Sequence, residues 1–144
     1  MNYQDIPKYS YKLNTLFHYN FITVATAFWS KYKKTNKYAA IGLADIKQLD
    51  KDKFVFVRRI DGRGKIEYER IVYDRKQSQI LADLFVKEKE SRSISERCIY
   101  RWDSVNNAVN YDLFVIKETW PKFIRSAMAK WGIKRMESAL RNTT

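Results

Sequence analysis

The residues that most often perform covalent or metal chemistry are nearly absent from this chain of 144 residues. It contains one cysteine, Cys98, and one histidine, His18. A single thiol makes no internal disulfide and no cysteine-based zinc site, and one histidine cannot build a histidine-rich zinc site. A catalytic pair of Cys98 and His18 can be drawn on paper. The interpretation that we favour is that Cys98 is a small buried hydrophobe in a strand.

Carboxylates offer another route to catalysis. Glu67 and Glu69 share one face of a predicted strand, and a paired-carboxylate mechanism stays open there. Because they alternate with residues such as Lys65, we expect a solvated edge of the sheet instead. The segment Asp61-Gly62-Arg63-Gly64 has too few glycines for a nucleotide-binding loop and predicts a hairpin turn. We therefore expect a protein that is not an enzyme, with no catalytic residue, no metal and no required cofactor.

The charge of the chain indicates its class of partner. Lysine and arginine number 28 against 16 aspartate and glutamate residues, giving a net charge of +12 and a pI near 9.8. This excess predicts a nucleic acid, an anionic lipid or an acidic protein surface as partner. A solubilising surface charge is the alternative, although about 2–8 charges usually serve that purpose. The basic residues are spread along the chain and match no zinc-finger, RRM or helix-turn-helix pattern, so we do not expect nucleic acid.

The elements that position these residues predict one α+β domain. Asn20 suits the N-cap of a helix that begins at Phe21, and Pro121 suits the first turn of a long final helix. Residues 1–16 predict an extended arm, and residues 17–144 a single domain. Between the helices we expect an antiparallel meander, with strand candidates at residues 54–60, 65–73, 79–87, 95–102 and 111–119.

Both predicted helices carry apolar residues at helical spacing. The first stripe comprises Phe21, Val24, Phe28 and Tyr32, and the second comprises Ile124, Ala127, Met128, Trp131 and Leu140. Basic residues decorate the rest of the final helix, which can therefore lie across a sheet or along an acidic surface. Gly132 predicts a break in this helix or a close packing contact.

Lys31 is the candidate binding residue, because it follows a helix that otherwise buries Phe28 and Trp29. A curved sheet grasped by helices can enclose an acyl-chain cavity, with one or two cations at its mouth for a phosphate. A snorkelling surface lysine is an equally open alternative.

Four segments in the correct order resemble the PRELI-like (slowmo) family. The run Phe21-x-x-Val24-x-x-Ala27-Phe28-Trp29-x-Lys31-Tyr32 resembles the opening helix of that family, and Phe17 and His18 fall near an aromatic and a histidine that usually precede it. The other segments are Arg58-Arg59-Ile60, Ser95-Glu96-Arg97-Cys98-Ile99-Tyr100 and Glu118-Thr119-Trp120. Order and spacing agree along most of residues 16–135.

This resemblance implies a PRELI/START-like fold, in which an N-terminal helix and a long C-terminal helix pack across a concave antiparallel sheet. It also implies a mitochondrial intermembrane-space protein that transfers phosphatidic acid or phosphatidylserine, in complex with a small twin-cysteine-motif chaperone. Lys31 falls on a basic position associated with the phosphate headgroup, and Arg59 on a basic strand position near the cavity. We add Lys33, Lys34 and Lys37 as predicted contacts to a membrane or another anionic surface.

The chain departs from the family in the parts that shuttle lipid. Lys33-Lys34-Thr35-Asn36 stands where family members have Pro-Asn-Pro, and Ile60 runs straight into the four-residue turn where they have a longer lid. So short a turn cannot serve as a mobile lid. We therefore expect a PRELI-like domain reused as a structural accessory subunit of a mitochondrial inner-membrane complex, either of the respiratory chain or ATP synthase, in contact with anionic lipid. An intermembrane-space phospholipid transfer protein is the alternative.

The sequence predicts association with the membrane rather than insertion into it. No apolar run approaches the ~18 residues that a transmembrane helix needs. The N-terminal segment lacks the patterns of a signal or transit peptide, so any mitochondrial address is expected to be internal or to lie outside those patterns.

Overall fold

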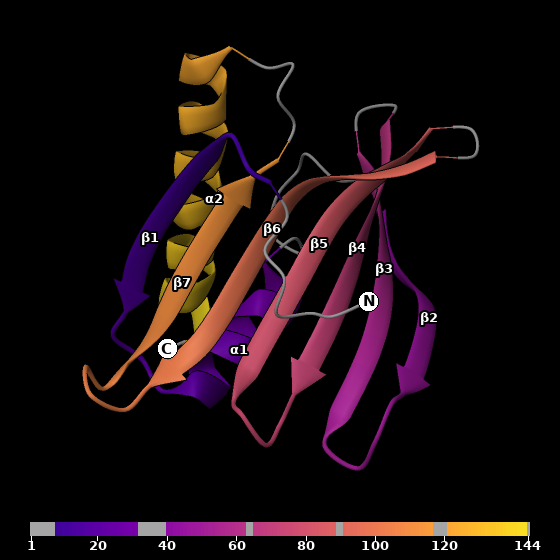
Figure 1. Ribbon diagram of the computed structural model, residues 1–144. Helices are drawn as coiled ribbons and strands as arrows, with labels where there is room; N and C mark the ends of the chain where they lie inside the picture. The colour runs from indigo at the N-terminus through magenta and orange to yellow at the C-terminus, as the bar shows by residue number, and fades with distance from the viewer. Residues whose placement is uncertain (1–7, 32–39, 63–64, 89–90, 117–120, 144) are drawn as a thin grey trace.

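A computed structural model describes residues 8–31, 40–62, 65–88, 91–116 and 121–143. Within them, seven strands form one antiparallel open sheet in the order β1-β7-β6-β5-β4-β3-β2 (Figure 1). The strands are β1 (Tyr11–Phe17), β2 (Ala40–Gln48), β3 (Lys53–Gly62), β4 (Lys65–Asp74), β5 (Gln79–Glu88), β6 (Ser91–Asp103) and β7 (Ala108–Val115). The helices are α1 (Phe21–Ser30) and α2 (Lys122–Thr143). The predicted α+β class and the antiparallel meander are confirmed.

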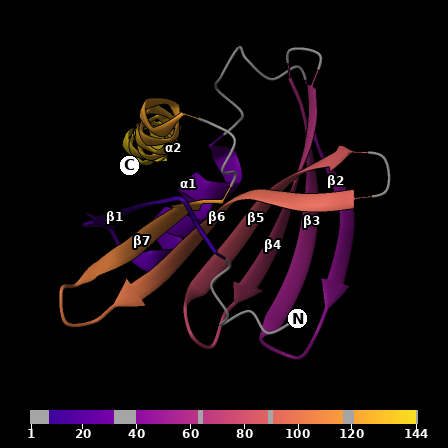
Figure 2. The same cartoon turned by 45° about the horizontal axis from the view of Figure 1, so that its top comes forward.

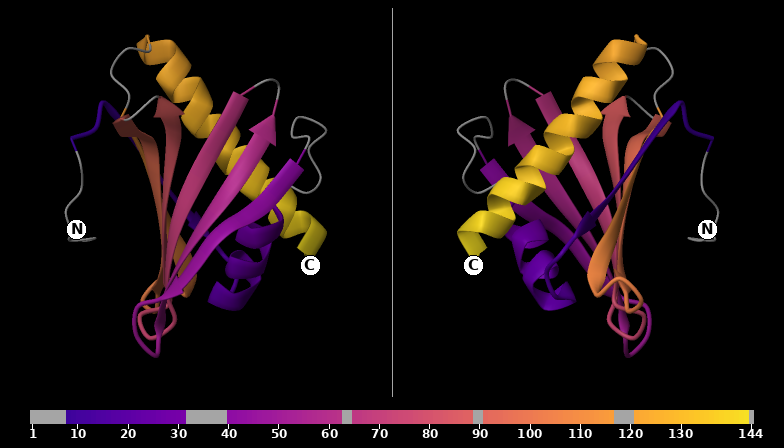
Figure 3. Two further views of the ribbon diagram at one scale, coloured as in Figure 1. Left: turned by 90° about the vertical axis from the view of Figure 1, so that its right-hand side faces the viewer. Right: turned by 90° about the vertical axis from the view of Figure 1, so that its left-hand side faces the viewer.

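Both helices lie on the same face of the sheet (Figure 3). Helix α2 lies over the end of the sheet formed by β1 and β7 and also contacts α1 (Figure 2). The predicted N-cap is confirmed, because Asn20 Oδ1 accepts a hydrogen bond of 2.8 Å from the backbone N–H of Thr23. That bond satisfies one of the first amide groups of α1, which have no partner inside the helix.

Two strands lie outside the predicted set. Residues 11–16 of the predicted arm, together with Phe17, form β1, which pairs with β7 from Tyr11↔Val115 to Phe17↔Val109. Strand β2 pairs with β3 and contains a register shift between Leu43 and Asp45. Its sequence, AIGLADIKQ, includes alanine, glycine and aspartate, which are depleted in strands, and so carries little strand signal.

Large side chains fill the space between the helices and the sheet. Aromatic rings form a continuous series across four elements, with centroid distances of 5.3 Å from Phe28 to Tyr100, 4.8 Å from Tyr100 to Tyr111 and 5.4 Å from Tyr111 to Phe17. The aliphatic residues Val24, Ile71, Leu113, Met136 and Leu140 complete this core. The core ties α1 and α2 to β1, β4, β6 and β7.

The opposite face of the sheet carries a smaller apolar cluster of Val55, Val72, Leu81, Ile99 and Phe114. The ring of Tyr9 packs edge-on against Phe114 at a centroid distance of 5.0 Å. Beside this cluster Arg97 donates to both carboxylate oxygens of Asp83, at 2.6 and 2.9 Å, and both side chains are buried. A bidentate, charge-assisted pair of this kind fixes the register of β5 against β6.

Helix α2 turns a different face to the core from the one that its predicted stripe suggested. Of that stripe only Leu140 is fully buried, and Trp131 is 58% exposed. The face that packs on the fold consists of Ala129, Met136, Ala139 and Leu140. Small alanines there let α2 approach the sheet closely.

Gly132 lies inside α2, which is unbroken, so of the two predicted alternatives, a break or a packing contact, the break is wrong. A Cβ atom at this position would meet Leu113 Cδ2 and Tyr111 Oη at 3.7 Å, ordinary van der Waals contact. We expect Gly132→Ala to raise the free energy of unfolding by about 1 kcal/mol, because alanine loses less backbone entropy in a helix than glycine does. Urea denaturation measures the change, and Ala127→Gly is the matched control, with a decrease of similar size expected. A loss of stability in Gly132→Ala would show that the packing at Leu113 tolerates no methyl group.

Candidate functional site

Lys31 lies at the C-cap position of α1 and is buried, with an exposed fraction of 8%. Its ammonium group lies 4.4 Å from the centroid of the Phe28 ring and 3.3 Å from Glu69 Oε2. The snorkelling alternative is therefore wrong, since the charged end of Lys31 points into the protein. The cation is engaged by an aromatic face and a carboxylate from within the same chain.

Arg58, on β3, is the second buried cation beside α1. Its Nε donates to Glu69 Oε1 at 2.9 Å, and its Nη2 donates to the same oxygen. Its Nη1 donates to the backbone carbonyl of Trp29 at 3.1 Å, and both terminal nitrogens reach the carbonyl of Phe28, at 3.4 and 3.5 Å. The last carbonyls of a helix have no partner within it and carry partial negative charge. Arg58 therefore caps the C-terminal end of α1 and ties it to the sheet.

Glu69, on β4, accepts from both cations and is 3% exposed. Burial by itself would raise the pKa of this carboxyl group, but the charges and hydrogen bonds of Lys31 and Arg58 outweigh burial and lower the pKa. The prediction of a solvated edge is thus wrong for Glu69, although Glu67 and Glu69 do share a face. We call Lys31, Arg58 and Glu69 the anchor cluster.

A second carboxylate, Glu96, lies on the same face in the row that crosses the sheet through Arg58, Glu69, Leu84 and Glu96. Glu96 is half-buried. Burial raises its pKa to about 7, the negative charges of Glu69 and Glu67 act in the same direction, and Lys31 and Arg135 oppose them. Glu96 therefore changes its charge near neutral pH beside the anchor cluster.

Arg59 and Lys31 are not brought together. Alternation along β3 places Phe56 and Arg58 toward the helices, and it places Val57 and Arg59 on the opposite face. The Arg59 side chain is 46% exposed, and its Nε donates to Asp61 Oδ1 at 2.7 Å. The family resemblance implied a role for Arg59 rather than for its neighbour Arg58. Alternation from Phe54 and Phe56 could have identified Arg58 as the residue that faces α1.

The predicted surface contacts Lys33, Lys34 and Lys37 lie outside the described residues, as does Tyr32 of the first apolar stripe. The predicted strand end at residues 117–119 lies outside them as well. Their roles stay predictions.

The thiol of Cys98 is buried in β6, as the sequence predicted. Its Sγ atom lies 3.4 Å from the hydroxyl oxygen of Tyr111. Burial raises the pKa of this thiol to about 12, so the thiol stays protonated at neutral pH. His18 is exposed in the segment between β1 and α1. The features of an activated nucleophile are therefore missing at Cys98.

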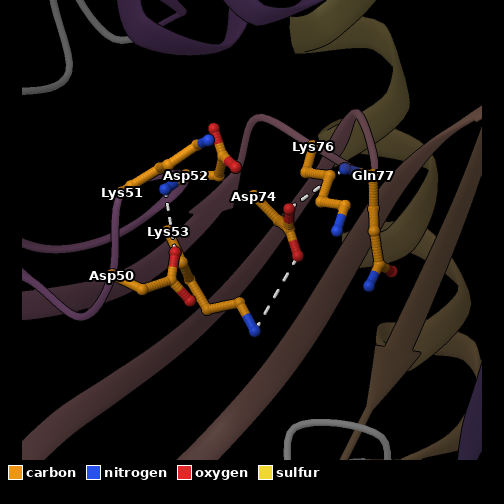
Figure 4. Close-up of a pocket in the computed structure, with 7 residues that line it drawn as sticks. All are labelled: Asp50, Lys51, Asp52, Lys53, Asp74, Lys76 and Gln77. Atoms are coloured by element: carbon orange, nitrogen blue, oxygen red, sulfur yellow. Dashed lines mark hydrogen bonds and ion pairs between the residues drawn. The ribbon is translucent and has the colours of Figure 1, made fainter.

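A shallow pocket of about 480 Å³ lies at the turns that join β2 to β3 and β4 to β5 (Figure 4). Its lining residues are Asp50, Lys51, Asp52, Lys53, Asp74, Lys76 and Gln77. Asp74 pairs with the Lys53 ammonium at 3.8 Å and accepts from the Gln77 backbone N–H at 3.0 Å. Three aspartates and three lysines balance one another here, so the pocket offers no net charge to a ligand.

The described residues contain neither a metal-binding cluster nor a membrane-spanning helix. No group of three or more histidine, cysteine, aspartate or glutamate side chains in that part of the chain could hold a metal ion. None of the described helices is long and apolar enough to cross a membrane.

Comparison with known proteins adds no assignment. A scan against protein-family models finds no model that matches the chain, and a search of curated proteins finds no relative. The resemblance to the PRELI-like family accordingly stands on the four sequence segments alone.

Proposed function

We propose that this protein is a non-catalytic accessory domain that docks stably on a mitochondrial inner-membrane complex and touches anionic lipid only at its surface. The anchor cluster carries this proposal. Lys31, the residue that the family resemblance assigns to a phosphate headgroup, is held by Glu69 inside the fold. A headgroup could reach Lys31 only by displacing that carboxylate from two buried cations, which is energetically unfavourable.

The basic charge supports the same proposal. Lys31 and Arg58 are buried in the interior of the domain. They are only two of the 28 lysine and arginine residues of a chain whose net charge is +12. Most of the basic side chains must therefore lie at the surface, where they attract an acidic partner over the distance of a Debye length.

Phospholipid transfer is the second candidate, and the fold itself favours it. An antiparallel sheet with two helices on one face is the architecture that the resemblance implies for a lipid carrier. Fold does not fix function, however, so the two candidates are separated by behaviour.

Native gel electrophoresis of gently solubilised membranes, followed by a vesicle transfer assay, tests the proposal. We expect the full chain to migrate with a complex much larger than its own 17.3 kDa. The purified chain is expected not to accelerate the exchange of labelled phosphatidic acid between vesicles above the rate measured without protein. Migration as a free chain, combined with rapid transfer, would support the carrier instead.

A further inference from the structure

A second apolar stripe on α2 faces away from the core. Phe123 is 73% exposed and Trp131 is 58% exposed. With 3.6 residues per turn, Phe123, Ala127 and Trp131 follow one another along one side of the helix. The two aromatic side chains are therefore about 12 Å apart along the helix axis, with a small side chain between them.

Basic residues accompany this stripe. Lys130 and Lys134 are exposed and stand one turn apart beside Trp131, and Arg141 is exposed further along the helix. Glu137 is the exposed acidic residue in the same part of α2. The stripe is thus flanked by a surplus of positive charge.

Other exposed apolar residues in the described part of the chain are scattered. They belong to five different segments: Tyr9 before β1, Ile22 on α1, Ile46 and Leu49 at the end of β2, Ile66 on β4, and Val105 between β6 and β7. Single exposed apolar residues are normal on a soluble surface and require no explanation. The stripe on α2 differs, because two large aromatic residues share one face with cations beside them.

The shape of the stripe distinguishes a protein partner from a bilayer. Tryptophan is enriched among residues that dominate protein–protein binding energy, where it fills well-formed pockets. Ala127, which is partly exposed, carries only a methyl group, so the space between the two rings allows a partner to approach the helix closely. A fluid bilayer has no fixed surface shape that would be complementary to the space between the two rings.

We propose that Phe123, Ala127 and Trp131 dock into an apolar groove of a protein partner whose rim carries acidic side chains that meet Lys130 and Lys134. This inference rests on the proposed function and names the surface through which the domain docks. Helix-in-groove recognition of this type reads anchors spaced along one helix face.

A pair of double variants of the full chain tests the surface. Phe123→Ser with Trp131→Ser is expected to weaken association with the large complex at least about 30-fold, the effect of losing about 2 kcal/mol of binding energy. Ile22→Ser with Val105→Ser removes two apolar side chains elsewhere that are even more exposed, and this variant is expected to associate like the unmodified chain. Urea denaturation verifies that both variants fold. If both variants stay with the complex, the α2 surface is wrong while the proposed function holds. If the unmodified chain migrates alone, both fail.

A photo-crosslinking amino acid at position 131 identifies the occupant, with position 105 as the control. The expected adduct is a peptide of another protein that combines apolar residues with net negative charge. An adduct with phospholipid, with a second copy of this chain or with a basic peptide would overturn the proposal. Absence of any adduct at position 131, in a chain that migrates with the complex, would overturn it too.

Discussion

Replacing Glu69 with glutamine is expected to lower the free energy of unfolding by about 3–5 kcal/mol at neutral pH. The variant keeps the size of the side chain but removes the carboxylate that pairs with the two buried cations, Lys31 and Arg58. Such a loss is a large part of the 5–15 kcal/mol by which a typical domain is stable. Urea denaturation followed by circular dichroism measures it directly.

The control for Glu69→Gln is Asp61→Asn, which removes the carboxylate from the exposed Arg59–Asp61 pair on the same hairpin. An exposed pair is screened by solvent and contributes at most about 1 kcal/mol. A triple replacement, Glu69→Leu with Lys31→Met and Arg58→Met, is expected to recover much of the loss, because the two buried cations are removed together with their carboxylate. If Glu69→Gln were as mild as Asp61→Asn, the anchor cluster would not be a buried ionic site.

Low pH is also expected to lower the stability that the anchor cluster contributes, because protonation of Glu69 removes the same negative charge. The pKa of Glu69 is lowered in the folded protein, so its contribution is complete above the ordinary pKa of 4.5. It is then lost as the pH falls through the folded value. Glu69→Gln should remove this acid-sensitive part of the stability.

The second large effect on the free energy of unfolding is expected at Glu96. Its pH dependence is opposite in sign to that of Glu69. Its pKa lies at about 7 in the folded protein against an ordinary 4.5, so the folded state binds the proton more tightly than the unfolded state does. Stability attributable to this group therefore falls as the pH rises from about 4.5 to about 7, and stays low above that. The difference corresponds to a free energy on the order of 3 kcal/mol.

Glu96→Gln is consequently expected to be more stable than the unmodified protein at pH 8, by up to about 3 kcal/mol, and nearly equal to it at pH 4.5. Urea denaturation at a series of pH values gives the profile. Glu137→Gln, at an exposed position on α2, is the control and should change stability by less than about 0.5 kcal/mol. A gain at pH 4.5 as large as that at pH 8 would show that the effect comes from packing rather than from titration.

The sequence predicted the architecture well because the strongest signals are local. The N-cap at Asn20, the antiparallel pairing of β3 with β4 and the alternating strand segments each depend on a few neighbouring residues. Strand β1 could also have been found, since Tyr11, Leu13 and Thr15 alternate with Lys12 and Asn14 at the period of a half-buried strand. Strand β2 could not, because its stability comes from pairing with β3 rather than from its own composition.

The site was harder to predict because it depends on contacts between distant residues. Lys31 and Glu69 are 38 positions apart, and nothing local to either residue indicates that they meet. The helix face of α2 was misjudged for a similar reason. Apolar spacing marks two faces of α2, and only contact with β7 and α1 decides that the face with Met136 and Leu140 is buried while Trp131 is exposed.

The central claim is that the interior of this domain is occupied by its own side chains and that Lys31 serves the fold. The most direct measurement is the rate at which the purified chain moves fluorescent phosphatidic acid from donor vesicles to acceptor vesicles. We expect a rate equal to that of vesicles alone. Circular dichroism must show that the chain is folded at the protein concentrations used. A rate clearly above that background would contradict it and would identify the protein as a lipid carrier.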